Sequence, residues 1–121
     1  MIDLSGKVTV VTGGAQGIGR AIAELLAQQG SNVVVADIQM EKAEATAKEI
    51  AANTGQQAIA VQVDVADSDS AKAMIDSAIA ELGRVDILIN NAGITRDNLI
   101  MRMGEDEWDL VLSINLKGAF N

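Results

Sequence analysis

The stretch that decides the fold is Val8–Gly19, VTVVTGGAQGIG, in which a run of β-branched residues is followed at once by a cluster of glycines. The residues from Val8 to Thr12 are typical of a buried parallel strand. Apolar residues then recur at the spacing of a helix, at Ile18, Ala21, Ile22, Leu25 and Leu26. The glycines therefore lie where a strand becomes a helix.

This order of strand, glycine turn and helix predicts a phosphate-binding site. The first turn of a helix carries free N–H groups and the positive end of the helix dipole. We expect Gly13 to adopt a turn conformation that other residues avoid, Gly17 to let a pyrophosphate approach the backbone, and Gly19 to let the helix pack closely on the strand. An ordinary glycine-rich turn is the alternative.

Composition narrows the class of protein. A chain of 121 residues with 49% hydrophobic residues predicts one domain with an ample core. The formal net charge of −8 argues against nucleic acid and against an anionic membrane surface as partners. Because the sequence has no cysteine and no histidine, it excludes disulfides, thiolate chemistry and imidazole-based metal sites, and we expect no metal. With no signal-like N-terminus and no long apolar run, we expect a cytoplasmic protein.

Two further apolar runs, Asn32–Asp37 and Ala58–Asp64, predict strands that each end in an aspartate. Asp37 lies 18 residues after Gly19, where a carboxylate at the end of the second strand can accept hydrogen bonds from an adenosine ribose. The same charge would repel the 2′-phosphate of NADP, so NAD(H) is favoured. A solvated aspartate at a strand end is the alternative interpretation.

The remaining periodicity completes an α/β pattern. We predict helices over Glu41–Ala52 and Ser68–Leu82, and a fourth strand over Val85–Asn90. Asp64 or Asp67 could begin the second of these helices as an N-cap. Strands that alternate with helices require right-handed parallel crossovers, so the prediction is a doubly wound, Rossmann-type α/β fold.

The last part of the chain is less regular. We expect Ile94–Met103 to be a loop with a helical turn, and Glu105 onward to be a helix. One face of that helix would carry Trp108, Val111, Leu112, Asn115, Leu116 and Ala119. Asn115 is polar within this apolar stripe and must find hydrogen-bond partners, which makes it a candidate functional residue.

Two motifs carry a resemblance to a known family. The spacing Thr12-Gly13-x-x-x-Gly17-x-Gly19 and the later Asn90-Asn91-Ala92-Gly93 resemble the two fingerprints of short-chain dehydrogenases/reductases. The resemblance runs over the whole chain and is closest to bacterial 3-oxoacyl-acyl-carrier-protein reductases, above all in NNAGITRDNLIMRM. It implies the strand order 3-2-1-4 and an NAD(P)-binding domain over residues 1–121 that corresponds to the N-terminal half of the family's domain.

The resemblance also implies roles for single residues. Asp64 and Val65 would contact the adenine ring, and Asn115 would be catalytic by holding a water molecule in a proton relay. The full predicted cofactor set is Thr12, Gly13, Gly14, Gln16, Gly17, Ile18, Gly19, Asp37, Ile38, Asp64, Val65, Asn91, Ala92 and Gly93.

The implied activity is reduction of a 3-oxoacyl thioester, linked to acyl-carrier protein, in fatty-acid synthesis. These reductases usually prefer NADPH, so NADP(H) is possible beside NAD(H). Their chemistry needs a tyrosine, a lysine and a serine that this sequence lacks at the family's positions, and it has no tyrosine at all. We therefore expect the 121 residues alone to be inactive.

Other functions stay open at this stage. The chain could be a stand-alone dinucleotide-binding module, a non-catalytic fragment that pairs with another polypeptide, or part of a short-chain dehydrogenase with a different substrate. We expect a homo-oligomer, dimer or tetramer, in the parent protein. In the expected order the fourth strand would be an unprotected edge, which predicts association of the isolated chain.

Overall fold

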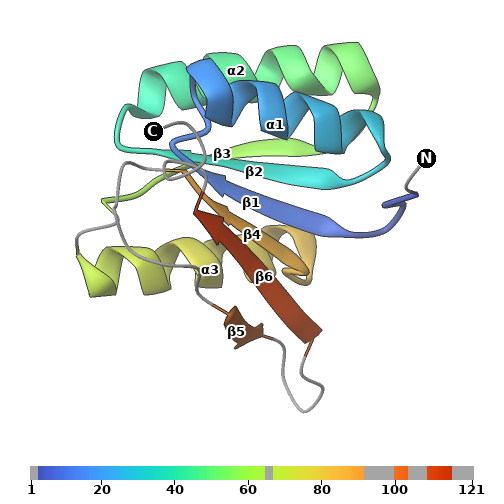
Figure 1. Ribbon diagram of the computed structural model, residues 1–121. Coiled ribbons are helices and arrows are strands. Elements are labelled where there is room, and N and C mark those ends of the chain that lie inside the picture. Colours follow the sequence, from blue (N-terminus) through green and yellow to red (C-terminus); the bar gives the residue numbers. More distant parts are fainter. Residues whose placement is uncertain (1–2, 65–66, 92–99, 104–108, 116–121) are drawn as a thin grey trace.

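The computed structural model describes residues 3–64, 67–91, 100–103 and 109–115. They form one mixed sheet with three helices around it (Figure 1). The elements in chain order are β1 (Val8–Thr12), α1 (Gly17–Gln28), β2 (Asn32–Asp37), α2 (Met40–Thr54), β3 (Ala58–Gln62), α3 (Ser68–Leu82), β4 (Ile87–Asn90), β5 (Ile100–Met103) and β6 (Asp109–Asn115).

The strand order in the sheet is β3-β2-β1-β4-β6-β5. The pairs formed by β1, β2, β3 and β4 are all parallel, which confirms the predicted order 3-2-1-4 and the doubly wound fold. The order reverses beside β1, because β2 lies on one side of it and β4 on the other. In a sheet of this kind the carboxyl ends of the strands flanking such a point form a crevice.

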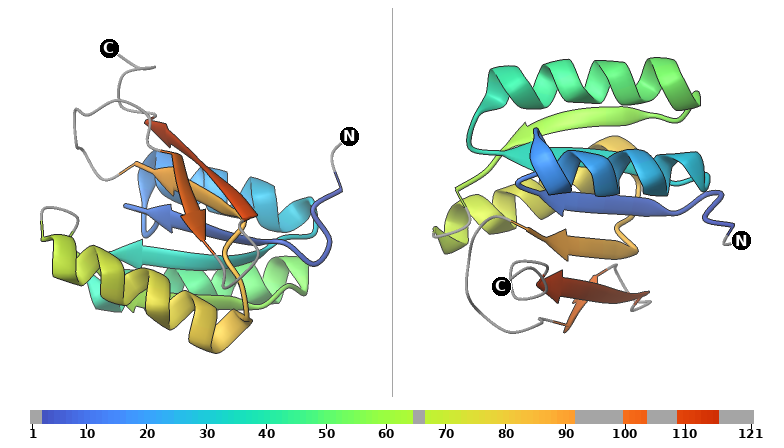
Figure 2. Two further views of the ribbon diagram at one scale, coloured as in Figure 1. Left: turned by 90° about the horizontal axis from the view of Figure 1, so that it is seen from below. Right: turned by 45° about the horizontal axis from the view of Figure 1, so that its top comes forward.

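The sheet is covered on both faces. Helices α1 and α2 lie on one face and α3 lies on the other (Figures 1 and 2). Each face of the sheet has its own hydrophobic core. Alternate residues of the central strands contribute to the two cores, since successive strand side chains point to opposite faces. Val10 and Val34 belong to the core on the α3 side, while Val11 and Val35 belong to the core under α1 and α2.

Small residues bring α1 close to the sheet. Its buried positions are Gly19, Ala23 and Ala27, whereas Ile18 and Leu25 are 43% and 54% exposed. The apolar spacing that predicted this helix therefore does not mark its most buried stripe. A helix seated this closely needs residues with little or no side chain at the contact.

The helix ends follow their capping residues. Gly55 ends α2 and Gly83 ends α3, both in the left-handed conformation that glycine adopts without strain. The carboxylate of Asp67 accepts hydrogen bonds from the N–H groups of Asp69 and Ser70, at 2.9 and 3.4 Å. Of the two candidate N-caps, Asp67 is therefore the one that begins α3.

The helix predicted from Glu105 onward is wrong over the described residues. Asp109–Asn115 forms strand β6, which pairs in parallel with β4 and places Asn115 opposite Asn90. Strand β5 then pairs with β6 in antiparallel fashion, where a loop was expected. The β-branched residues of β6 suit a strand as well as a helix face, and the free edge of β4 offers backbone hydrogen bonds that decide between them.

This pairing also corrects the expectation that β4 is an unprotected edge, since β6 covers it.

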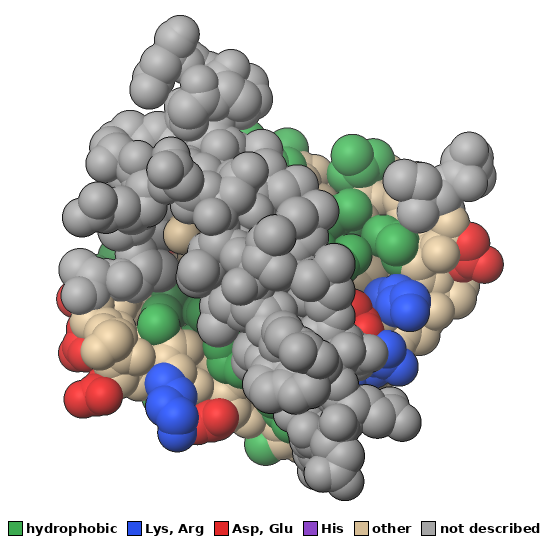
Figure 3. Space-filling view, turned by 60° about the horizontal axis from the view of Figure 1, so that its bottom comes forward, with side chains coloured by type: hydrophobic (Ala, Val, Ile, Leu, Met, Phe, Trp, Pro, Cys, Tyr) green, Lys and Arg blue, Asp and Glu red, His purple; other side chains and the backbone are tan. Residues whose placement is uncertain are grey.

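Among the described residues, no helix is long and apolar enough to cross a membrane. On the face drawn in Figure 3, described acidic and basic side chains lie near one another.

Candidate functional site

The glycine turn joins β1 to α1 in the conformation that its sequence requires. Gly13 and Gly17 have φ angles of +63° and +61°, a region that other residues rarely adopt. A Cβ atom at Gly17 would meet nothing within 4 Å, so the backbone there is open to a ligand. A Cβ atom at Gly19 would lie 2.0 Å from the carbonyl oxygen of Gly13. Close packing at Gly19 is therefore obligatory, as the sequence predicts.

The start of α1 presents free donors beside this turn. Gln16 is the N-cap, and its side chain makes no capping hydrogen bond. The first N–H groups of a helix have no partner within the helix, and they lie at the positive end of its dipole. This end of α1 is therefore suited to an anion such as a pyrophosphate.

Thr12 links the glycine turn to the end of β4 and to Asn91, which follows it. Its hydroxyl donates to Oδ1 of Asn90 at 3.0 Å and accepts from the backbone N–H of Asn91 at 2.9 Å. The side-chain amide of Asn91 in turn reaches the carbonyl oxygen of Gly13 at 3.5 Å. The structure thus brings the described residues of the two family fingerprints together at one edge of the sheet.

Asp37 at the end of β2 faces the same turn. One carboxylate oxygen accepts from the N–H of Ala15 at 3.1 Å and the other from the N–H of Gln39 at 3.0 Å. The side chain is half-buried. The carboxylate therefore braces the glycine turn, a role that sequence spacing alone did not indicate.

A cavity of about 390 Å³ lies beside the glycine turn and the end of β2. Its volume is within the range of small-molecule sites. The cavity brings together six of the residues predicted to bind a cofactor, and one, Val63, that the sequence did not single out. Val63 directly follows β3 and is 3% exposed, so only its packing could have identified it. The lining residues are Gly13, Gln16, Asp37, Ile38, Val63, Asp64 and Asn91.

The cavity is bordered by groups of both negative and positive charge. Two carboxylates, from Asp37 and Asp64, line it, while the donor end of α1 offers positive potential. Lys42 of α2 approaches from outside, donating to the side-chain oxygen of Gln16 at 3.2 Å. The arrangement suits a ligand with hydroxyl groups near the aspartates and an anionic group near the glycines.

Among the described residues, one ion pair of Arg20 joins α1 to α2, and a second lies within α1. Arg20 contacts Glu24 at 3.0 Å, and it also contacts Glu49 of α2. Hydrogen bonds to Glu24 first, and then to Glu49, raise the pKa of Arg20 above its usual value. Arg20 therefore stays charged and is engaged with carboxylates.

The other predicted site residues divide into three groups. Thr12 ends β1, and Gly14, Gly17, Ile18 and Gly19 belong to the turn and the start of α1. Val65, Ala92 and Gly93 lie outside the described residues, and Asn115 ends β6. Within the part of the chain that the structure describes, no cluster of three or more His, Cys, Asp or Glu side chains could hold a metal ion.

A parallel sheet of order 3-2-1-4 with a glycine turn at its switch point defines the Rossmann class of α/β folds. The sequence matches the family model of short chain dehydrogenases over residues 7–121. The chain belongs to the short chain dehydrogenase family.

Curated relatives are similar over nearly the whole chain. The 3-oxoacyl-[acyl-carrier-protein] reductase FabG of Staphylococcus aureus is 53% identical over 116 residues, which cover 95% of this chain and 47% of the relative. The enzyme of the same name from Thermotoga maritima is 44% identical over 118 residues, covering 98% of this chain and 48% of the relative. The chain thus spans about half the length of the curated relatives it matches.

Solved structures agree with the fold. A hydroxysteroid dehydrogenase from Escherichia coli superposes with a TM-score of 0.72 at 42% identity, over 76% of this chain and 39% of that one. An L-sorbose reductase from Gluconobacter frateurii, complexed with NADPH and L-sorbose, superposes with a TM-score of 0.73 at 36% identity, over 86% of this chain and 39% of that one.

Proposed function

We propose that residues 1–121 supply the cofactor-binding half of an NAD(P)H-dependent oxidoreductase. Its reaction is the reduction of a 3-oxoacyl thioester, carried by acyl-carrier protein, to the 3-hydroxyacyl form in fatty-acid synthesis. The observation that carries this proposal is the 53% identity to a 3-oxoacyl-[acyl-carrier-protein] reductase over 95% of the chain.

The site geometry supports a binding mode for the dinucleotide. The ribose and adenine would lie among Asp37, Ile38 and Asp64, with Val65 added from the family resemblance alone, and the pyrophosphate would lie over the backbone of residues 16–19. The nicotinamide end would extend past Asn91, toward Ala92 and Gly93, as the family resemblance implies. When bound, the dinucleotide supplies the hydride, and the residues of this chain hold and orient it.

The carboxylate of Asp37 favours NADH over NADPH in this proposal. It lines the cavity, and in the described contacts it accepts from backbone N–H groups, whereas Lys42, which approaches the cavity from α2, donates to Gln16. A 2′-phosphate placed within a few ångströms would meet a like charge. The structure of the sorbose reductase is a complex with NADPH. NADP(H) is therefore the alternative cofactor, and its Kd is to be measured beside that of NAD(H).

The proton that follows the hydride must come from elsewhere. Reduction of a ketone adds hydride to the carbonyl carbon and a proton to its oxygen, and the donor must lie within hydrogen-bond reach. The sequence contains no tyrosine, histidine or cysteine, so we assign the acid to the part of the relatives that this chain does not match. Asn115 is proposed to order a water molecule in that relay.

The expected setting is a cytoplasmic homo-oligomer that accepts an acyl-carrier-protein-linked substrate.

The test of the proposed function has two parts. Immunoblotting of the source cells measures the mass of the polypeptide that contains this sequence, and we expect about twice 12.6 kDa. That polypeptide is then assayed for NADH and NADPH oxidation with a short 3-oxoacyl thioester, L-sorbose and a ketosteroid. Preference for either of the last two would overturn the proposed substrate class.

A further inference from the structure

The peptide groups on both sides of Ala15 are held by residues from two different elements. The N–H of Ala15 donates to Asp37 at the end of β2, at 3.1 Å, and its carbonyl oxygen accepts from the hydroxyl of Thr46 on α2, at 2.6 Å. Ala15 is 4% exposed and Thr46 is 2% exposed. The centre of the glycine turn is therefore fixed from the side of α2 as well as from the sheet.

The bond from Thr46 is not the usual one for a helical threonine. A hydroxyl in a helix commonly donates to the carbonyl one turn earlier. Thr54 on the same helix does this, donating to the carbonyl of Ile50 at 2.7 Å. The hydroxyl of Thr46 instead leaves its helix and spans to the turn, 31 residues away in sequence.

This bond fixes the orientation of the peptide group between Ala15 and Gln16, beside the cavity. In a trans peptide the C=O and the following N–H point in opposite directions, and every peptide in the described chain is trans. Holding the carbonyl of Ala15 against α2 therefore also fixes the N–H of Gln16, a residue that lines the cavity. It also keeps the partly negative carbonyl oxygen of Ala15 bonded to α2, so that this oxygen does not turn toward an anion in the cavity.

Burial makes the bond hard to replace. With Thr46 and Ala15 both almost fully buried, water has little access to this carbonyl. A buried acceptor that loses its donor is destabilising, and the turn would gain by rotating the peptide to find another partner. Such a rotation would turn the N–H of Gln16 as well.

We propose that Thr46 is a positioning residue that holds the glycine turn in its anion-binding conformation. This inference rests on the proposed function only in identifying the anion as the pyrophosphate of a dinucleotide. Thr46 does not line the cavity, and it acts through Ala15.

The test compares variants that lack the hydroxyl of Thr46 with a variant that keeps it. Thr46→Val keeps the shape of the side chain and removes the hydroxyl, while Thr46→Ser keeps the hydroxyl. Thr46→Ala, paired with Thr46→Ser, gives the same comparison if the valine variant does not fold. Thr54→Val is the matched control, because it removes a threonine hydroxyl from the same helix away from the turn.

Two measurements are made on the 121-residue chain. Amide hydrogen exchange without ligand follows Gly14 and Ala15, whose N–H groups bond to Ala36 and Asp37. NADH titration, followed by the cofactor's fluorescence, gives its Kd. We expect Thr46→Val to speed this exchange about tenfold and to raise the Kd about fivefold. Thr46→Ser should stay within about twofold of the unaltered chain in both, and Thr54→Val should change neither.

Unchanged exchange in Thr46→Val would overturn the inference. So would faster exchange with an unchanged Kd, since Thr46 would then be only structural. Equal effects of Thr46→Ser and Thr46→Ala would show that the hydroxyl is not the cause. If the unaltered chain binds no NADH, the proposed function and the identity of the anion both fail, and the exchange measurement still decides whether Thr46 holds the turn.

Discussion

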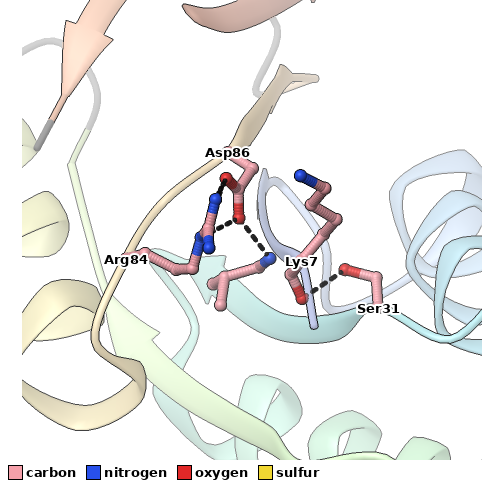
Figure 4. Close-up of polar contacts among 5 residues, drawn as sticks. Lys7, Ser31, Arg84 and Asp86 are labelled. Carbon is pink, nitrogen blue, oxygen red and sulfur yellow. Dashed lines mark hydrogen bonds and ion pairs between the residues drawn. The ribbon is translucent and has the colours of Figure 1, made fainter. Parts of the chain in front are cut away.

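The carboxylate of Asp86 accepts a hydrogen bond from the backbone N–H of Val8 at 2.9 Å, where β1 begins. The N–H of Asp86 donates in return to the carbonyl of Val8, also at 2.9 Å. Asp86 is 8% exposed and also pairs with the guanidinium of Arg84 (Figure 4). Beside this pair, Ser31 donates to the carbonyl of Lys7 at 3.2 Å. The strands β1 and β4 are thus fastened at the end of the sheet opposite the cavity.

We expect Asp86→Ala to lower the free energy of unfolding by about 2 kcal/mol, since it removes a charged acceptor from a buried N–H group. Urea denaturation measures the change. The control is Asp76→Ala, which removes an exposed carboxylate that lies 3.7 Å from Lys72. That pair is solvated, so its loss should change stability by less than about 0.5 kcal/mol. Equal effects of the two variants would show that the Asp86 contact adds no stability.

Gly19→Ala should abolish or strongly weaken NADH binding. The new Cβ would lie 2.0 Å from the carbonyl oxygen of Gly13, and backbone must move to admit it. We expect the Kd to rise more than about tenfold, or about 1.4 kcal/mol. Gly55→Ala is the control: its φ of +78° makes alanine strained, but it ends α2 away from the turn. It should cost stability without changing the Kd, and tight NADH binding by Gly19→Ala would contradict the proposed binding mode.

Asp37→Asn should reduce the preference for NADH over NADPH. The substitution removes a charge that would face a 2′-phosphate. It keeps one of the two oxygens that accept from the N–H groups of Ala15 and Gln39, and the loss of the other acts on both cofactors alike and cancels in the ratio. We expect the ratio of the two Kd values to fall about fivefold or more. Asp69→Asn, at an exposed residue in the first turn of α3, should leave the ratio unchanged. Tighter binding of NADPH than NADH by the unaltered chain would mean that Asp37 does not meet the ribose.

The 121-residue chain should bind NADH without reducing a short 3-oxoacyl thioester at an appreciable rate. A general acid near the substrate oxygen is required, and the sequence has no tyrosine, histidine or cysteine to provide one. Absorbance at the nicotinamide band measures turnover, and a parallel titration measures binding. Turnover comparable with that of the longer parent polypeptide would overturn the assignment of the acid to the unmatched half.

The described Asn115 shows how a face pattern can mislead. Its apolar neighbours fit a helix, yet Val111, Leu112 and Ile114 fit a strand equally well, and intrinsic preference does not separate the two over seven residues. The edge of β4 supplied the deciding hydrogen bonds. Residues far apart in sequence thus fixed a local conformation.

The sequence by itself determined the four parallel strands, their helices and the glycine turn. Each of these rests on local chemistry: β-branched runs for β1 and β2, glycines at positive φ, and aspartate or glycine at the helix ends. Only the tertiary structure decided that Thr46 spans to Ala15, that Asp37 braces the same peptide, that Val63 lines the cavity and that β6 covers β4. These contacts join residues that are distant in sequence, so they could not be predicted from periodicity and spacing along the chain.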